Sequence, residues 1–252
     1  MSCVLLGHRR DHFLRDLSDS AFRYGPTLRI GIKIPRSVAV NCLARRLGMT
    51  LFNSVKGFID QLDVCGWAVM TDFSGREDAS LLMEECREAF ENGDFHQAGV
   101  GRGAERVIRE DIRRDRVMWL QPGELSLEQT RYLDWLETLR LALNQRFFLG
   151  LFGFEGHFAI YPVGAFYKPH LDRHSGTQDR IVTVILYLNP DWQPGDGGEL
   201  RLWTTPGDKD GAFDLIEPRM GTLVMFMAGD HWHEVLPALK TRMSITGWFR
   251  QR

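Results

Sequence analysis

The sequence predicts a mainly β domain, a sandwich or a barrel, with helices packed on its outer face. After Gly153 the spacing of apolar residues changes from the helical period to strict alternation. Short β-rich runs then alternate with turn clusters such as NPDWQPGDGG and TTPGDKDG, a pattern typical of sandwiches and barrels. The helical patterns precede the strands along the chain, which favours helices that flank a β-structure.

The first 48 residues differ from the rest of the chain in charge. Residues 1–48 hold 9 Lys+Arg and 3 Asp+Glu, whereas the remainder holds 22 and 30. Their apolar periodicity is poor, so we predict a basic, poorly ordered extension over 1–48 and a folded domain over 49–252. An N-terminal arm, an organelle transit peptide and a start codon placed too far upstream are three explanations, and we favour the last.

The composition is that of an ordinary globular protein, with 44% hydrophobic and 25% charged residues. The net charge of −2 provides no global field that would favour nucleic acid. Four scattered cysteines without a C-x-x-C pair argue against a disulfide framework and suit a reducing compartment. The chain has neither a run of 18 apolar residues nor an apolar signal core. We therefore expect a cytoplasmic protein with no nucleic-acid or membrane partner.

The helical part is predicted in order along the chain. Residues 55–65 have helical spacing, and residues 66–73 indicate a short strand. Ser74 with Glu77 forms a capping-box pattern before a second helix, whose apolar stripe is Leu81, Leu82, Cys86, Ala89 and Phe90. Ser126 with Gln129 opens the longest helix, 127–146. The Gly-rich stretch 91–112 predicts a flexible loop, because its GVGRG lacks the context of a phosphate-binding motif.

The strands follow from alternating apolar runs. We predict them at 117–120, 156–162, 180–189, 198–203, 214–218, 221–227 and 242–250, with a further strand ending at His170.

A candidate metal site lies in the last third of the chain. His170 and Asp172 end the run YPVGAFYKPHLD, His233 follows the apolar run GTLVMFM, and Arg242 comes nine residues later. A His-x-Asp pair alone arises by chance about as often as not in a chain of this composition, and solvated loop residues with a core histidine would explain it. On a strand, however, residues two apart share a face, so both could reach one metal. Two histidines and a carboxylate suit a non-haem Fe(II) site with open positions, at strand ends in a barrel mouth.

Three other histidines compete for the same roles. His231 is two residues from His233, and we interpret it as a loop residue or a neighbour of the ligands. We expect His174 near the entrance without contact to the metal, and His157, which precedes a strand, to be structural.

Several segments together resemble a known family. They are IRRDRVMWL, GHFAIYP, ILYLNPDWQPGDGGELRL and HEVLPA followed by TRMSITGWF, within about 190 residues from Phe58 to the C-terminus. The chain is similar to the prolyl 4-hydroxylase type of 2-oxoglutarate- and Fe(II)-dependent dioxygenases. Within that type it resembles the oxygen-sensing hydroxylases of hypoxia-inducible factor and their bacterial relatives. The resemblance implies a double-stranded β-helix (jelly-roll) core of eight strands with the N-terminal helices packed outside.

The resemblance also implies roles for individual residues. His170, Asp172 and His233 would bind iron, and Arg242 would pair with the distal carboxylate of 2-oxoglutarate, as would the Tyr187 hydroxyl. The co-substrate pocket would be lined by Thr183, Leu200, Thr246, Trp248 and Tyr161. The substrate side would hold Tyr167, Arg180 and Asp115. An Asp115–Arg180 ion pair would set the position of a mobile loop over residues 96–111.

The activity implied is O2-dependent 4-hydroxylation of a prolyl residue in a protein, with release of succinate and CO2. A translation elongation factor is the candidate substrate, and ascorbate is a candidate reductant. Hydroxylation of a small molecule or a free amino acid is the alternative. A nucleic-acid demethylase of the same superfamily is disfavoured because the β-region has no basic stripe. A β-barrel binding module that has lost its metal is disfavoured by the intact triad.

Overall fold

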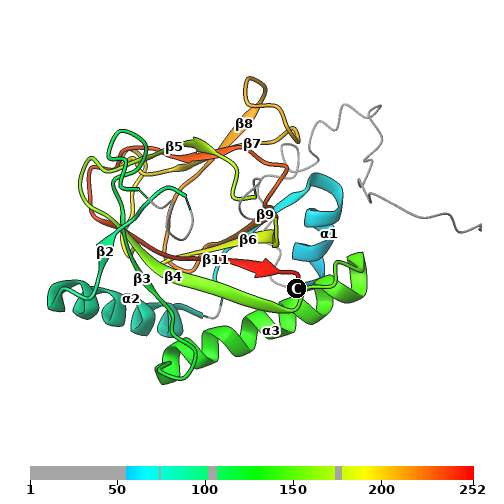
Figure 1. Cartoon of the computed structure of the whole chain (residues 1–252), viewed down its shortest axis with the longest axis horizontal. Helices are drawn as coiled ribbons and strands as arrows, with labels where there is room; N and C mark the ends of the chain where they lie inside the picture. Colours follow the sequence, from blue (N-terminus) through cyan, green and yellow to red (C-terminus); the bar gives the residue numbers. More distant parts are fainter. Residues whose placement is uncertain (1–54, 74, 102–106, 174–177) are drawn as a thin grey trace, which may run out of the picture. The chain divides into compact units, whose positions relative to one another are not determined.

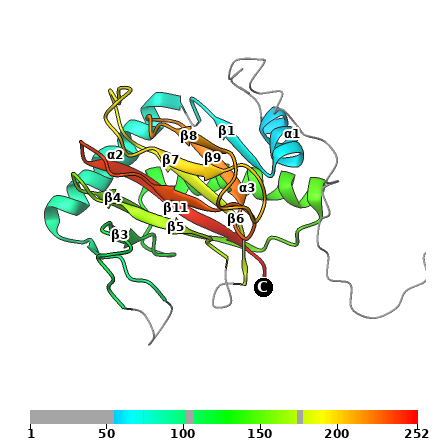
Figure 2. The same ribbon diagram turned by 90° about the horizontal axis from the view of Figure 1, so that it is seen from above.

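Two antiparallel sheets face each other, and helices cover the larger one (Figures 1 and 2). This computed structural model describes residues 55–73, 75–101, 107–173 and 178–252. The predicted extension 1–48, the predicted cap Ser74, part of the GVGRG motif and His174 lie outside these residues.

The larger sheet has seven strands in the order β1-β9-β6-β11-β4-β3-β2. Their bounds are β1 Trp67–Met70, β2 His96–Gln97, β3 Arg116–Trp119, β4 Gly153–Tyr161, β6 Arg180–Tyr187, β9 Leu223–Met227 and β11 Arg242–Arg250. The smaller sheet has the order β5-β10-β7-β8. Its strands are β5 Tyr167–His170, β7 Leu200–Trp203, β8 Phe213–Ile216 and β10 His233–Val235.

The jelly-roll core is the run from β4 to β11, which gives four strands to each sheet. This confirms the predicted double-stranded β-helix and its eight strands. The strands β1, β2 and β3 extend the larger sheet at its two edges. Two short strands, β2 and β10, are not evident from the sequence, because two or three residues are too few to show a period.

Three helices pack on the outer face of the larger sheet, as predicted: α1 Val55–Cys65, α2 Gly75–Asn92 and α3 Leu127–Phe147. Leu82, Leu139 and Leu143 of α2 and α3 are buried in one apolar cluster with Phe158 and Ile245 of the sheet. Leu81, predicted within the apolar stripe of α2, is instead 40% exposed. No helix in the described part of the chain is long and apolar enough to cross a bilayer.

The start of α3 matches its sequence signal only in part. Ser126 is the N-cap, and its hydroxyl accepts a hydrogen bond from the Gln129 backbone N–H at 3.0 Å. In a complete capping box the Gln129 side chain would reach back to the cap. Here that side chain donates to the Glu85 carboxylate of α2, and the Ser126 hydroxyl donates to the same carboxylate. Ser126 and Gln129 therefore mark the start of α3, and their side chains also link α3 to α2 through Glu85.

A second apolar cluster lies between the two sheets. Ala159 and Tyr187 of the larger sheet are buried there with Leu200, Leu202 and Val235 of the smaller one. The central strands of the larger sheet, such as β6 and β9, are thus buried on both faces. Alternate residues belong to the helix-side cluster and the inter-sheet cluster, which is why β6 is apolar apart from Arg180, Thr183 and Tyr187.

Gly247, in the middle of β11, has no room for a side chain. A Cβ there would collide with the Phe154 ring and the Glu155 carbonyl oxygen, whereas a Cβ at Gly153 on the neighbouring strand would meet nothing within 4 Å. We predict that Gly247→Ala lowers the free energy of unfolding by about 2 kcal/mol or more. Gly153→Ala should change it by less than about 0.5 kcal/mol. Urea unfolding of both variants checks this, and equal stabilities would contradict it.

Candidate metal and co-substrate site

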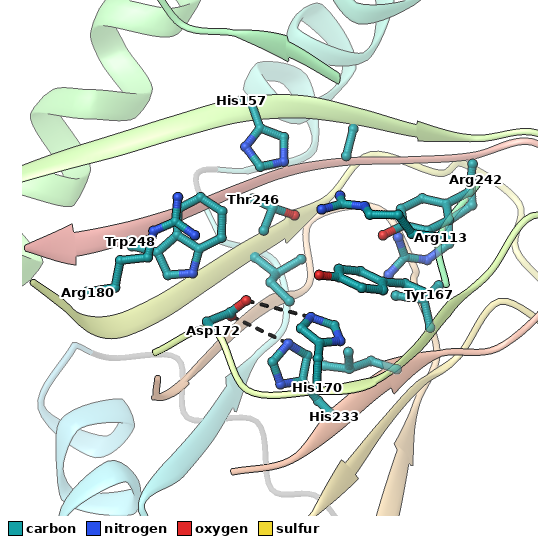
Figure 3. A pocket seen from close by; sticks show the side chains of 15 residues that line it. Arg113, His157, Tyr167, His170, Asp172, Arg180, His233, Arg242, Thr246 and Trp248 are labelled. Carbon is teal, nitrogen blue, oxygen red and sulfur yellow. Dashed lines mark ion pairs between the residues drawn. The ribbon is translucent and has the colours of Figure 1, made fainter. Parts of the chain in front are cut away.

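A cavity between the sheets is lined on one side by alternate residues of β11. Arg242, Thr246 and Trp248 point into it, and Ser244 is buried on the same face. Side chains two apart on a strand share a face, so one strand carries the whole row. The other lining residues are Arg113, His157, Ala159, Tyr161, Tyr167, His170, Asp172, Arg180, Ile185, Leu200, His233 and Val235 (Figure 3).

His170, Asp172 and His233 lie together on the opposite wall of this cavity. Their ligand atoms all lie within 4.8 Å of one another, and in the described part of the chain no other such group of three was found. His233 opens β10 directly opposite His170 at the end of β5. The Nε2 atoms of His170 and His233 lie 3.6 and 3.4 Å from the carboxylate oxygens of Asp172. The predicted triad therefore converges on one point.

Asp172 reaches the cluster from a turn, and not from the strand face that it was predicted to share with His170. Strand β5 ends at His170, so Asp172 does not share a strand face with it. The turn after β5 directs the carboxylate inward, where the Arg173 backbone N–H donates to the Ala228 carbonyl at 3.0 Å. The His-x-Asp spacing therefore identified two residues that do lie together, but a turn brings them together and not a shared strand face.

Hydrogen bonds fix the orientation of both histidine rings. The Nδ1 of His170 lies 2.8 Å from the Lys168 carbonyl oxygen, and the Nδ1 of His233 lies 3.1 Å from the His231 carbonyl oxygen. Each Nδ1–H donates to its carbonyl, which leaves the Nε2 lone pair free for a metal. Burial, together with His170, lowers the pKa of His233 to about 4, so this ring is uncharged at neutral pH.

The carboxylate of Asp172 is prepared in a similar way. The Thr183 hydroxyl donates to its Oδ2 at 2.7 Å. Burial acts to raise the pKa of Asp172, but the two histidines and Thr183 outweigh it and hold the pKa well below its usual value. Thr183, which we predicted to line the co-substrate pocket, is fully buried, and its hydroxyl orients Asp172. Two neutral imidazoles and one carboxylate form the donor set that Fe(II) takes when other positions must stay open.

His231 faces away from this cluster. It is fully buried, and its Nδ1 lies 2.8 Å from the Trp203 carbonyl oxygen. Its Nε2 stands 2.6 Å from the point that a Cβ on Gly66 would occupy. Because β10 begins only at His233, the two histidines do not share a strand face.

Arg242 brings an uncompensated charge to the end of the cavity. It is 1% exposed, its Nε donates to the Gly198 carbonyl at 2.9 Å, and its guanidinium lies 4.9 and 4.8 Å from the ring centres of Tyr161 and Tyr187. No described carboxylate lies within ion-pair distance of it. The Tyr187 hydroxyl also lacks a hydrogen-bond partner among the described residues.

A buried charge without a partner is costly, so this end of the cavity favours a bound anion. Burial raises the pKa of Tyr187 even though Arg242 opposes the shift, so the phenol keeps its proton and can donate. A guanidinium with an adjacent phenol suits a carboxylate. The residues present thus fit both a metal and a dicarboxylate.

The predicted Asp115–Arg180 ion pair is wrong. Asp115 is fully buried and accepts two hydrogen bonds from Arg113, one of them from Nε at 2.7 Å. Arg180 instead donates to Glu155 at 2.8 Å, with its guanidinium carbon 3.4 Å from the Trp248 ring centre. Asp115 is fully buried beside Arg113, whereas Arg180 lines the cavity.

Five residues that line the cavity were not predicted: the apolar Ala159, Ile185 and Val235, and the polar Arg113 and His157. Arg113 lies 4.2 Å above the Tyr167 ring, which in turn stacks on His170 at 3.6 Å. His157, expected to be structural, lines the cavity from β4. The sequence contained a signal for each of the two polar residues. Arg113 is two residues from Asp115 and His157 is four from Tyr161, and residues at an even spacing on a strand share a face.

Comparison with known proteins agrees with this geometry. Residues 156–250 match the 2OG-Fe(II) oxygenase superfamily. Egl nine homolog 1 of Homo sapiens is 33% identical over 192 residues, which is 73% of this chain and 43% of that protein. The hypoxia-inducible factor prolyl hydroxylase of Caenorhabditis elegans is 28% identical over 208 residues, 77% of this chain and 28% of that protein. The chain spans about half the length of the Egl nine homologs 1 that it matches.

Solved structures give the same result. A Pseudomonas putida prolyl-4-hydroxylase has a TM-score of 0.71 and 43% identity, over 78% of this chain and 99% of that one. A Trichoplax adhaerens prolyl hydroxylase, solved with a hypoxia-inducible factor oxygen degradation domain peptide fragment, has a TM-score of 0.68 and 28% identity, over 78% of this chain and 89% of that one. With the paired histidines, the aspartate and the buried arginine in one jelly-roll cavity, this chain belongs to the 2OG-Fe(II) oxygenase superfamily and shares its domain with the prolyl hydroxylases.

Proposed function

We propose that this protein is a 2-oxoglutarate- and O2-dependent hydroxylase that acts at the 4-position of a prolyl residue in a protein. The observation that carries the proposal is the buried, unpaired charge of Arg242 in the same cavity as the metal-binding triad. His170, Asp172 and His233 would hold Fe(II), and Arg242 with Tyr187 would hold the distal carboxylate of 2-oxoglutarate. Bound Fe(II) would supply the oxidative chemistry, in which 2-oxoglutarate and O2 yield succinate and CO2 and the second oxygen atom enters a substrate C–H bond.

The residues of the chain prepare the site for that chemistry. The two Nδ1–H bonds to backbone carbonyls present Nε2 of His170 and His233 to the metal. Ile185, Leu200 and Val235 give the cavity apolar walls that limit access of water. Tyr167, held between Arg113 and His170, stands at the triad, where a substrate side chain would arrive. Leu200, Tyr161, Thr246 and Trp248 line the same cavity, which supports them as walls of the co-substrate pocket.

A protein substrate is supported by two relatives: one is named a hypoxia-inducible factor prolyl hydroxylase, and another was solved with a peptide fragment of that factor. For this chain we propose a translation elongation factor as the substrate, on its resemblance to bacterial members of the family. Ascorbate is the reductant we propose, and the cytoplasm is the compartment that its cysteine pattern favours.

The ligand assignment predicts which histidine is essential. His170→Ala, Asp172→Ala and His233→Ala should each abolish iron-dependent turnover of 2-oxoglutarate, because each removes a metal ligand. His231→Ala should keep most of the metal binding, at some cost in stability, because its ring faces Trp203 and Gly66. Metal content and turnover of the folded variants measure this. An inactive His231→Ala protein beside an active His233→Ala protein would reverse the assignment.

Thr183 should act through Asp172. Thr183→Val keeps the shape of the side chain but removes the hydrogen bond to the carboxylate. We predict a loss of metal affinity of roughly tenfold or more, as is usual when a partner of a metal ligand is removed. Titration with Fe(II) in the absence of O2 measures the affinity. Unchanged affinity would show that the turn after β5 orients Asp172 without this bond.

The co-substrate clamp predicts a selective defect. Removing a buried charge from a carboxylate pair costs roughly 2–5 kcal/mol. Arg242→Ala should therefore raise the 2-oxoglutarate requirement by tens of times while metal binding remains, and Tyr187→Phe should raise it less. Arg219→Ala is the matched control, because this arginine is exposed and paired with Glu217. An Arg242→Ala enzyme with an unchanged requirement would remove the residue from the site.

The substrate is tested by comparing three candidates. Turnover of 2-oxoglutarate is measured with free proline, with a proline-containing loop peptide and with the intact elongation factor. We expect coupled turnover with the polypeptides, a mass gain of one oxygen atom at proline and negligible action on the free amino acid. Robust turnover on free proline alone would favour a small-molecule hydroxylase.

A further inference from the structure

His157 occupies the centre of the cavity wall formed by the larger sheet. On β4 it stands directly opposite Trp119 of β3 and Thr246 of β11, and only 4% of it is exposed. Its imidazole points into the cavity, on the wall across from the triad (Figure 3).

Two indole rings hold the imidazole in place. The ring centres of Trp119 and Trp248 lie 4.8 and 5.5 Å from that of His157. The indoles themselves lie 6.4 Å apart. A side chain held by aromatic neighbours on two sides has a defined direction, which is what a residue that positions a ligand needs.

The imidazole is uncharged. Burial, and then the nearby charges of Arg113 and Arg180, lower its pKa to about 3. A neutral imidazole has one donor nitrogen and one acceptor nitrogen. Nδ1 is buried and has no partner among the described residues. Because buried N–H groups without a partner are rarer than buried acceptors without one, we assign the proton to Nε2. His157 then acts as a hydrogen-bond donor.

Two other polar groups lie near His157. The buried Trp248 Nε1–H is a donor without a partner among the described residues, and the Thr246 hydroxyl, which can donate or accept, lines the same wall 3.4 Å from the Ser244 hydroxyl. The free indole donor fits a ligand with acceptor oxygens. The Arg242 guanidinium serves a different part of the cavity. It lies near the rings of Tyr161 and Tyr187, which stand opposite Arg242 and Ser244 in the strand register. His157 stands opposite Thr246, further along β11.

We propose that His157 is a positioning residue that donates a hydrogen bond, directly or through one water molecule, to the 2-oxo acid end of 2-oxoglutarate, the end opposite Arg242. The inference rests on the function proposed above and adds a third anchor to the co-substrate. Arg242 holds the distal carboxylate and the metal binds the oxo acid, while His157 sets the angle of that oxo acid against the sheet wall.

Two variants separate the nitrogens of His157 from its shape. His157→Phe keeps an aromatic ring against the two indoles and removes both nitrogens, whereas His157→Gln keeps a donor. In Mn(II)-loaded protein without O2, we expect His157→Phe to raise the Kd for 2-oxoglutarate roughly tenfold, and His157→Gln to keep it within about threefold. The affinity for Mn(II) should not change in either variant. If His157→Phe does not fold, His157→Leu provides the same comparison.

A spectroscopic reading distinguishes positioning from packing. Under argon, the visible absorption band of the complex with Fe(II) and 2-oxoglutarate should shift in His157→Phe and return towards the wild-type position in His157→Gln. His96→Phe is the control, because it removes an imidazole that does not line this cavity. A His157→Phe protein with wild-type affinity and band would overturn the inference. Equal losses of 2-oxoglutarate affinity in the Phe and Gln variants would also overturn it, because the shape of the ring, and not its nitrogen atoms, would then determine the affinity.

The test separates the two proposals. Wild-type protein that does not bind 2-oxoglutarate at all would refute the proposed function. Wild-type protein that binds it, together with a His157→Phe protein that binds it equally well, would refute only the role of His157.

Discussion

The central strand β11 has to satisfy two different environments at once. Ile245 and Phe249 are buried against the helices on one face, while Arg242, Thr246 and Trp248 face the cavity on the other. Strict alternation makes this possible, since neighbouring residues on a strand point to opposite faces. A register shift by one residue would place an arginine in the helix-side core and Ile245 in the cavity. The cavity therefore depends on the register of β11 with β4 and β6, and the room that Gly247 leaves for Phe154 helps to fix it.

Most polar groups buried around this cavity are satisfied, and the exceptions are informative. The triad residues have hydrogen bonds to backbone carbonyls or to Thr183. The Tyr187 hydroxyl, Nδ1 of His157 and Nε1 of Trp248 have no partner among the described residues. Buried polar atoms are normally paired, so unpaired ones that surround a cavity indicate where a polar ligand would complete the structure. The buried charge of Arg242 also indicates a bound polar ligand, and more strongly, because an unpaired buried charge costs more than an unpaired neutral group.

Charge at the outer side of the cavity is arranged in two separate networks. Arg113 is neutralised by the buried Asp115 and lies over Tyr167. Burial lowers the pKa of Arg113, but Asp115 outweighs this effect and raises it. Arg180 and Arg250 share Glu155, and Arg180 also covers the Trp248 ring. Arg113 and Arg180 are thus both compensated by carboxylates and held in fixed positions at the cavity, unlike Arg242, which has no carboxylate partner among the described residues.

The sequence by itself determined the elements and the chemistry of the ligands. Periodicity predicted the helices and most strands, since each element is long enough to show its own pattern, and residue types at motif spacing singled out His170, Asp172, His233 and Arg242. Only the tertiary structure decided which polar groups meet. It paired Asp115 with Arg113 and Arg180 with Glu155, directed Thr183 to Asp172, and brought His157 into the cavity wall. Contacts of this kind depend on register and on turns between distant segments, and the pattern within a single segment does not contain that information.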